Sequence, residues 1–117
     1  MELLNKYWPM ILVALYFGYK FYKKQKIKKM LPSLISQNAQ IIDVRSVVEF
    51  AMGNDPRSMN IPLNQLGSEL QKINKQTPVI VVCRSGSRSA MGSMVLKRAG
   101  YENVYNAGAW QNLLSAQ

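Results

Sequence analysis

One cysteine stands within a short run of small and basic residues, Cys83-Arg84-Ser85-Gly86-Ser87-Arg88-Ser89. A cysteine reacts as its thiolate, and nearby cations or a helix N-terminus lower the thiol pKa from its usual value of about 8.5. Arg84 and Arg88 supply positive charge, and Gly86 allows consecutive backbone N–H groups to turn inward as a nest for an anion. The segment therefore predicts a catalytic Cys83 with an anion-binding loop, residues 84–89, beside its sulfur.

The composition excludes several other uses of this cysteine. The chain of 117 residues contains one cysteine and no histidine. It therefore forms no internal disulfide and has no Cys-x-x-Cys pair, and it lacks the imidazole of Cys-His or Ser-His-Asp catalysis. We expect neither a metal site nor a cofactor, since zinc sites of this size normally use several histidines or cysteines. A solitary reactive thiol suits a reducing compartment.

The residues around Cys83 predict that it lies at the end of a strand. Val79-Ile80-Val81-Val82 is a β-branched run that predicts a strand buried on both faces. From Ser89 to Ala99 apolar residues recur at helical spacing, and Gly100 is a typical helix terminator. Ligands of such α/β sheets bind at the carboxyl ends of the strands, which is where this order places Cys83.

The rest of the chain after residue 30 alternates between strand and helix patterns. We expect further strands over residues 41–44, 59–61 and 103–105, and helices over residues 31–37, 47–51, 64–74 and 109–115. This alternation predicts the α/β class, with a parallel sheet between helices. Asp43 and Arg45 end a neighbouring strand, and we expect them to support the site rather than react. Arg45 and Glu49 are four residues apart and are expected to pair.

Four separated blocks of the sequence resemble one family. They are the loop Cys83 to Ala90; Ile41 to Arg45 with Glu49-Phe50; Gly53, Pro56, Ser58 and Asn60 to Leu63; and Gly100-Tyr101, Val104 to Asn106, Gly108 and Trp110. In this order they resemble the single-domain rhodaneses, which are sulfurtransferases. The resemblance covers residues 31–117. It implies a rhodanese-like five-stranded parallel sheet flanked by helices on both faces, preceded here by one N-terminal hydrophobic helix.

The sequence departs from the family pattern at three places. Asn54 and Arg57 stand where the second block usually has histidine and glycine, and Gly108-Ala109 replaces a closing glycine pair. These departures bear on substrate preference more than on fold.

The resemblance implies transfer of sulfane sulfur. The Cys83 thiolate would take the outer sulfur of thiosulfate or of a persulfide, and the Cys83 persulfide would pass it to cyanide or to a thiol such as glutathione or a thioredoxin-like protein. Phosphatases and arsenate reductases of the same fold have a longer Cys-x5-Arg loop, and many phosphatases keep a histidine at the position of Val82. The Cys-x4-Arg spacing here argues against both of those activities.

The N-terminal 30 residues form a separate segment, expected to be a hydrophobic anchor helix followed by a polybasic stretch. They hold seven lysines and one glutamate, which is +6 of the net charge of +9. The basic charge is therefore local and does not predict nucleic-acid binding. Residues 7–22 amount to sixteen positions, about 24 Å as a helix. That length is marginal for a hydrocarbon core of about 30 Å, although flanking lysines can extend its reach.

We expect residues 7–22 to form a single membrane span, with a helix lying in the membrane interface as the alternative. A signal peptide is rejected because the lysines follow the apolar run. The positive-inside rule then predicts a bacterial-type inner-membrane protein with its catalytic domain in the cytoplasm, and with residues 7–29 in contact with lipid. Because fold does not determine function, a membrane-tethered interaction or sensing module with little turnover stays open as an alternative.

Overall fold

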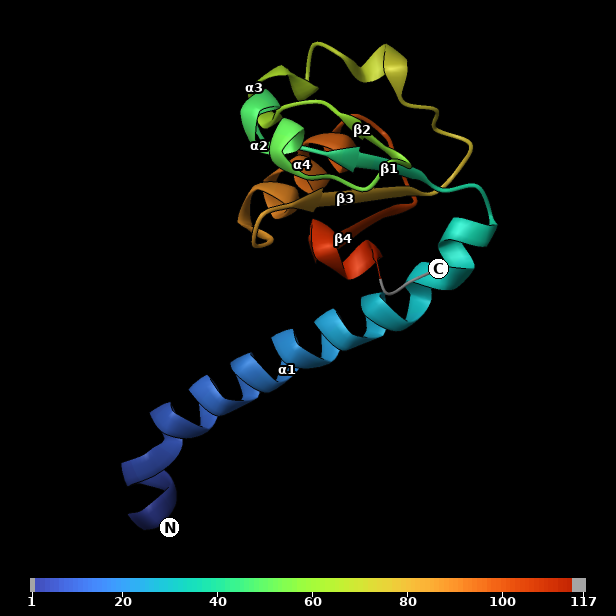
Figure 1. Cartoon of the computed structure of the whole chain (residues 1–117). Coiled ribbons are helices and arrows are strands. Elements are labelled where there is room, and N and C mark those ends of the chain that lie inside the picture. Colours follow the sequence, from blue (N-terminus) through green and yellow to red (C-terminus); the bar gives the residue numbers. More distant parts are fainter. Residues whose placement is uncertain (1, 115–117) are drawn as a thin grey trace.

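The computed structural model describes residues 2–114, which form one long helix and an α/β domain (Figure 1). The elements in chain order are α1 (Glu2–Ser36), β1 (Gln40–Asp43), α2 (Val47–Met52), β2 (Ser58–Asn60), α3 (Leu63–Leu66), the 3-10 helix η1 (Leu70–Lys72), β3 (Val79–Cys83), α4 (Ser87–Arg98), β4 (Val104–Ala109) and the 3-10 helix η2 (Trp110–Leu113).

The strands form one parallel sheet in the order β2-β1-β3-β4. β3 lies between β1 and β4, and all five of its residues are buried, as its β-branched sequence predicts. Asp43 at the end of β1 pairs with Val82, so the carboxyl ends of β1 and β3 meet at the same edge. The register between β3 and β4 shifts after Val81.

The expected five-stranded sheet is wrong, because the sheet has four strands within residues 2–114. The four strand patterns of the sequence account for all of them. Every residue from Glu2 to Ser36 belongs to α1, so the segment ahead of β1 leaves nothing extended for a fifth strand.

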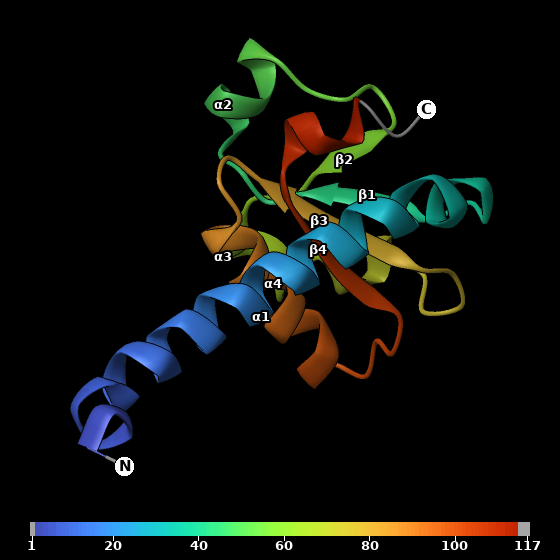
Figure 2. The ribbon, with the colours of Figure 1, turned by 90° about the horizontal axis from the view of Figure 1, so that it is seen from below.

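Helices cover both faces of the sheet, and the alternation of strand residues separates two cores. On one face Ile42, Val81 and Cys83 pack with Leu66 and Leu96 from α3 and α4. On the other face the core is formed by strand residues together with the end of α1 and η2; its buried members are Leu31, Leu34, Ile41, Ile80, Val82, Ala107 and Leu113. Figure 2, seen from below, shows α1 passing in front of the strands.

Helix α1 has two parts with different surroundings. Ile27, Met30 and Leu31 pack against the domain, so the separate helix expected over residues 31–37 is the last part of α1. Residues 3–22 project away from the domain (Figure 1), and their apolar side chains are exposed on all sides of the helix. The exposed fraction of Phe17, for example, is 63%.

The expected membrane span over residues 7–22 is not supported. Within the described part of the chain, no helix combines the length and the apolar character that crossing a membrane requires. The uncharged stretch of α1 is short, because Lys6 precedes it and Lys20 ends it, and it includes Pro9 and Gly18.

Three element boundaries also differ from expectation. The helix expected over residues 64–74 is broken: α3 ends at Leu66, Glu69 departs from helical dihedrals with a φ of −116° and a ψ of 20°, and η1 follows separately. Helix α4 begins at Ser87, two residues early, since Gly86 forms its N-cap with a φ of 112°. The helix expected over residues 109–115 is the 3-10 helix η2, and residue 115 lies outside the described residues.

Candidate active site

Cys83 is the last residue of β3 and is followed by a three-residue loop into α4. Its side chain is fully buried on the face of the sheet that α4 covers. The loop turns through Gly86, whose φ of 112° lies in the left-handed region that favours glycine. A Cβ on Gly86 would also lie 3.4 Å from the Cα of Gly108, so the loop and β4 approach each other closely.

The sulfur of Cys83 is surrounded by hydrogen-bond donors. The backbone N–H of Gly86 donates to Sγ at 2.8 Å, and Sγ lies 3.4 Å from the Ser89 hydroxyl oxygen. Burial raises the pKa of the Cys83 thiol, but the Ser89 hydroxyl and backbone N–H groups favour the thiolate more strongly. Those N–H groups belong to Ser89, Gly86 and Ser85. The net result is a pKa below the ordinary value.

Ser89 is held in place by Asn106 of β4. Its hydroxyl oxygen lies 2.5 Å from Oδ1 of Asn106 and 3.0 Å from the carbonyl oxygen of Gly86. Asn106 in turn accepts the Gly108 N–H at 3.0 Å and donates from Nδ2 to the Gly86 carbonyl at 3.4 Å. Sequence reasoning did not select Asn106, since a single asparagine near a strand end gives no signal of the hydroxyl it contacts.

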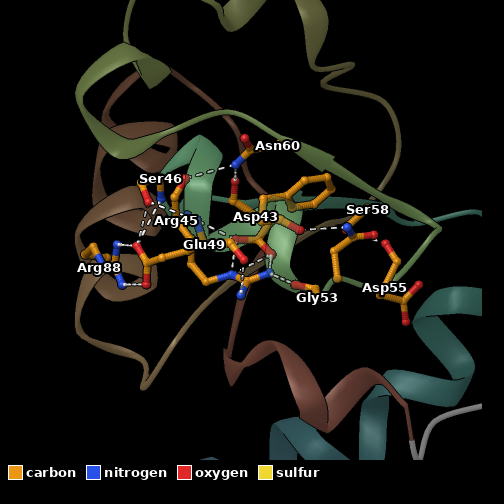
Figure 3. A network of polar contacts seen from close by, with 11 residues as sticks. Asp43, Arg45, Ser46, Glu49, Gly53, Asp55, Ser58, Asn60 and Arg88 are labelled. Carbon is orange, nitrogen blue, oxygen red and sulfur yellow. Dashed lines mark hydrogen bonds and ion pairs between the residues drawn. The ribbon is translucent and has the colours of Figure 1, made fainter.

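Arg88 is bound by Glu49 rather than by the sulfur (Figure 3). Its Nη1 and Nη2 donate to Oε1 and Oε2 of Glu49 at 2.6 and 2.9 Å. These bonds, with help from the N-cap Ser46 of α2, hold the pKa of Glu49 down at about 2. The Glu49 hydrogen bonds raise the pKa of Arg88, and the charge of an ionised Cys83 raises it further. Glu49 was also missed as a site residue by sequence reasoning.

The other predicted loop residues lie around the rim. Arg84, Ser85 and Ser87 are exposed, whereas Ser89 is buried beneath the loop. The structure therefore brings together Cys83 with the backbone of the loop and the hydroxyl of Ser89, and it leaves the side chain of Arg84 at the surface.

Asp43 and Arg45 form a buried pair behind the site (Figure 3). Nη2 of Arg45 lies 2.8 Å from Oδ2 of Asp43 and donates to the Gly53 carbonyl at 2.7 Å. The guanidinium also stacks on Trp110, 4.9 Å from the ring centroid. These contacts tie β1 to α2 and η2. The expected Arg45–Glu49 side-chain pair is wrong, because Asp43 takes Arg45, which reaches only the carbonyl of Glu49 at 3.3 Å.

The departures from the family pattern have structural uses. Arg57 forms an ion pair with the buried Asp55 at 2.7 Å and donates to the Leu113 carbonyl at 3.0 Å, so it joins the loop before β2 to η2. Asn54 donates to the Phe50 carbonyl at 2.8 Å at the end of α2. Among residues 2–114 no cluster of three or more His, Cys, Asp or Glu side chains could hold a metal ion.

Comparison with known proteins agrees with this geometry. The family described as Rhodanese-like domain matches residues 25–115. A sulfurtransferase of Allochromatium vinosum is 30% identical over 71 residues, covering 61% of this chain and 66% of the relative. The human single-domain sulfurtransferase TSTD1 has a TM-score of 0.66 at 28% identity, over 76% of this chain and 93% of that one. A structure described as rhodanese with anions from E. coli has a TM-score of 0.57 at 28% identity, over 63% and 89%.

The chain spans between 38% and 66% of the length of the first curated relatives that it matches. The family match itself extends from the end of α1 through the whole sheet and past Cys83. A four-stranded parallel sheet, a cysteine at the end of its central strand and a tight loop into the next helix all fall within it. The chain belongs to the rhodanese-like domain family.

Proposed function

We propose that this chain is a sulfurtransferase that carries sulfane sulfur on Cys83 as a persulfide. The observation that carries the proposal is the surroundings of the sulfur: a Gly86 N–H at 2.8 Å and a thiol pKa below its ordinary value, despite full burial. The names of the relatives in Allochromatium vinosum and human support the same activity.

With thiosulfate as donor, the reaction balances without a proton. The Cys83 thiolate attacks the outer sulfur, the S–S bond of thiosulfate breaks, and sulfite leaves with the electron pair. The product is Cys83-S-S⁻, whose negative charge lies on the terminal sulfur. Cyanide then attacks that sulfur and leaves as thiocyanate, which restores the thiolate. Sulfite and thiolate are stable anions, so the chemistry needs no general acid, in keeping with a chain that has no histidine.

The loop supplies two things in this proposal. Its N–H groups stabilise the thiolate before transfer and are close enough to hold the terminal sulfur afterwards. Cys83 is fully buried while Arg84 and Ser85 are exposed, so we propose that the donor approaches from the side of the loop.

Thiosulfate or a persulfide is the proposed donor, and cyanide or a thiol the proposed acceptor. Glutathione and a thioredoxin-like protein are the thiols to test first. We do not propose the phosphatase activity of proteins with longer loops. Only four residues separate Cys83 from Arg88, and the guanidinium of Arg88 is already bound by Glu49.

Mass spectrometry of the intact chain tests the proposal. After incubation with thiosulfate the chain should gain the mass of one sulfur atom, and cyanide should remove it with release of thiocyanate. Cys83→Ser should gain nothing, while Ser93→Ala, which removes a hydroxyl one helical turn beyond Ser89, should behave as the parent chain. Absence of the gain with both thiosulfate and glutathione persulfide would contradict the proposal.

The exposed part of α1 favours a second, tethering role beside or instead of turnover. Apolar side chains cover residues 7–19, and six lysines follow between residues 20 and 29. Exposed apolar surface of this extent marks an interaction site, and clustered lysines attract anionic lipid. We therefore propose that residues 7–29 contact an anionic lipid surface, without a span. In a bacterium, the cytoplasmic face of the inner membrane stays the predicted place.

Vesicle flotation of the full chain tests this tethering role. Binding to phosphatidylglycerol vesicles should exceed binding to phosphatidylcholine vesicles and should fall with salt and with Lys20, Lys23 and Lys24 changed to Gln. If the chain instead ignores both vesicles and forms oligomers through α1, the lipid proposal fails.

A further inference from the structure

The hydroxyl of Ser89 has one proton and three neighbours. Its oxygen lies 2.5 Å from Oδ1 of Asn106, 3.0 Å from the carbonyl oxygen of Gly86 and 3.4 Å from Sγ of Cys83. The first two are acceptors only, so they compete for the same proton. Sγ donates to the hydroxyl oxygen while it is a thiol, but it becomes an acceptor once it is ionised. The direction of the Ser89 proton must therefore depend on the charge of the sulfur.

The orientation of the Asn106 amide is fixed by its other partners. Oδ1 accepts the backbone N–H of Gly108 at 3.0 Å, and a backbone N–H can only donate. Reversing the amide would place its NH₂ group against that N–H and remove the donor from the Gly86 carbonyl. An acceptor therefore faces the Ser89 hydroxyl, and not a donor.

We propose that Asn106 is a positioning residue. Its Oδ1 accepts the hydrogen bond of the Ser89 hydroxyl whenever Sγ of Cys83 is uncharged, and the hydroxyl donates to Sγ instead when the sulfur is a thiolate. In the thiol the bonds run from Sγ–H to Ser89 and from Ser89 to Asn106. In the thiolate the Ser89 hydroxyl turns to the sulfur. This reorientation leaves no acceptor without a hydrogen bond. Asn106 Oδ1 still accepts the Gly108 N–H, and the Gly86 carbonyl still accepts the Ala90 N–H at 3.0 Å.

The same switch acts during sulfur transfer, and this step rests on the proposed function. When the thiolate takes an outer sulfur, the negative charge moves from Sγ to the new terminal sulfur, and Sγ becomes a neutral disulfide-type atom. The Ser89 proton then returns to Asn106, while the loop N–H groups serve the terminal sulfur. Asn106 thus stabilises the thiol and the persulfide relative to the thiolate.

The charged groups around this edge of the sheet are unchanged by alanine substitutions at residues 89 and 106. They are Asp43 and Arg45 from β1 and the residue after it, Glu49 from α2, and Arg84 and Arg88 from the loop and α4. A shift in the titration of Cys83 in such variants therefore reports the hydrogen bonds and not an altered charge.

A double-mutant cycle on the full chain tests the inference, with the ultraviolet absorbance of the thiolate followed against pH. Asn106→Ala should lower the pKa of Cys83 by about half to one unit, the size of one neutral hydrogen bond. In a Ser89→Ala background the same change should have no effect, because Asn106 acts through the hydroxyl. Ser93→Ala is the control for loss of a buried hydroxyl on α4. A raised pKa in Asn106→Ala, or a shift that persists without Ser89, would overturn the inference.

A second measurement follows the loaded form. At equilibrium with glutathione persulfide and glutathione, the ratio of persulfide to free Cys83 should fall about three- to tenfold in Asn106→Ala, measured above the thiol pKa by intact mass. An unchanged ratio contradicts the role in the persulfide. If the parent chain forms no persulfide at all, the proposed function fails, but the titration cycle still decides the role of Asn106.

Asn106→Asp covers the case in which the alanine variant does not fold, as judged by circular dichroism. A carboxylate in that place accepts from Gly108 and holds the Ser89 proton more tightly. It should raise the pKa of Cys83, and the rise should be smaller in the Ser89→Ala background. An equal rise in both backgrounds would show charge alone and would count against the switch.

Discussion

Glu49 determines how much of the positive charge of Arg88 is left for the sulfur of Cys83. The Glu49 carboxylate accepts hydrogen bonds from both terminal nitrogens of the Arg88 guanidinium. It also forms a capping box with Ser46 at the start of α2. Arg88 lies at the second position of α4, within the same turn that begins beside the sulfur. One ion pair therefore links the first turns of two helices and moderates the field at the nucleophile.

Loss of the Glu49 charge should make the thiol more reactive. In Glu49→Gln the negative charge disappears and Arg88 is released, and both changes favour the thiolate, so the pKa of Cys83 should fall by about half a unit or more. Alkylation by iodoacetamide at a pH below the thiol pKa should become faster. Glu102→Gln, at an exposed position after α4, should leave the rate unchanged. A slower rate in Glu49→Gln would contradict this account.

The same pair should give the stability of the domain a defined acid dependence. Hydrogen bonds from Arg88 lower the pKa of Glu49 from 4.5 to about 2 in the folded chain. The stabilisation is therefore complete above pH 4.5 and is lost as the pH falls through about 2. The urea midpoints of the parent chain and of Glu49→Gln should differ at pH 6 and converge toward pH 2. A difference that is constant over this range would refute the assignment.

At this scale the sequence predicted what depends on neighbours along the chain and missed what depends on folding. Strand, cysteine, glycine and helix follow one another directly, so the place of Cys83 was predictable. The partner of Glu49 was not, because Arg45 is closer in sequence than Arg88, and only the fold shows that Asp43 has already taken Arg45. Asn106 lies 17 residues from Ser89 and was missed for the same reason.

Among the elements, α4 determines how closely the loop is held to the sheet. At Gly92 the helix backbone lies against the sheet, and an added Cβ would lie 3.3 Å from Cγ1 of Val44 and of Val81, and 3.4 Å from Leu66. Glycine is needed there for close approach rather than for an unusual dihedral angle. Any larger side chain pushes α4, and with it the N–H groups around Cys83, away from β3.

Gly92→Val should therefore destabilise the domain by about 1–3 kcal/mol through overpacking. Urea denaturation measures the change. Gly67→Ala is the matched control: Gly67 has ordinary right-handed helical dihedrals and open space around it, so alanine should leave stability unchanged or raise it by up to about 1 kcal/mol. Equal loss in the two variants would show that close approach is not the cause.

The elements themselves were predicted unevenly. All four strands were anticipated. Runs of β-branched residues mark β1 and β3, whereas β2 and β4 contain no such run. The fifth strand came from the family resemblance alone and had no pattern of its own. The helix expected over residues 64–74 followed the spacing of Leu66, Leu70 and Ile73, but those side chains reach the core from two short pieces separated at Gly67.

In the whole molecule, α1 is both part of the domain and an extension from it. Its last turns bury Leu31 and Leu34 against the sheet, whereas the side chains before residue 25 are exposed. The sequence suggested a boundary near residue 30, since the lysines end there. The sequence did not reveal that one helix continues through this boundary. The apolar residues of α1 have only weak helical periodicity, and the burial of Leu31 and Leu34 against the sheet is visible only in the folded chain.

Removal of residues 1–24 should leave the unfolding free energy of the domain unchanged, because the packing of α1 begins at Ile27. Leu31→Ala in the full chain should lower that free energy by about 2–5 kcal/mol, as expected for a fully buried leucine. Urea denaturation of both variants tests this division of α1. If the truncated chain is the less stable of the two, the exposed turns contribute to the fold after all.

Because α1 is one continuous helix, it connects its first turns to the domain rigidly and not as a flexible linker. An α-helix turns by about 100° for each residue, so one residue inserted between Lys24 and Ile27 would swing the loop of Cys83 by that angle around the helix axis. A flexible connection of the same length would average such a change away. Whatever grips the first turns of α1 therefore also sets the direction in which the sulfur of Cys83 faces its donors.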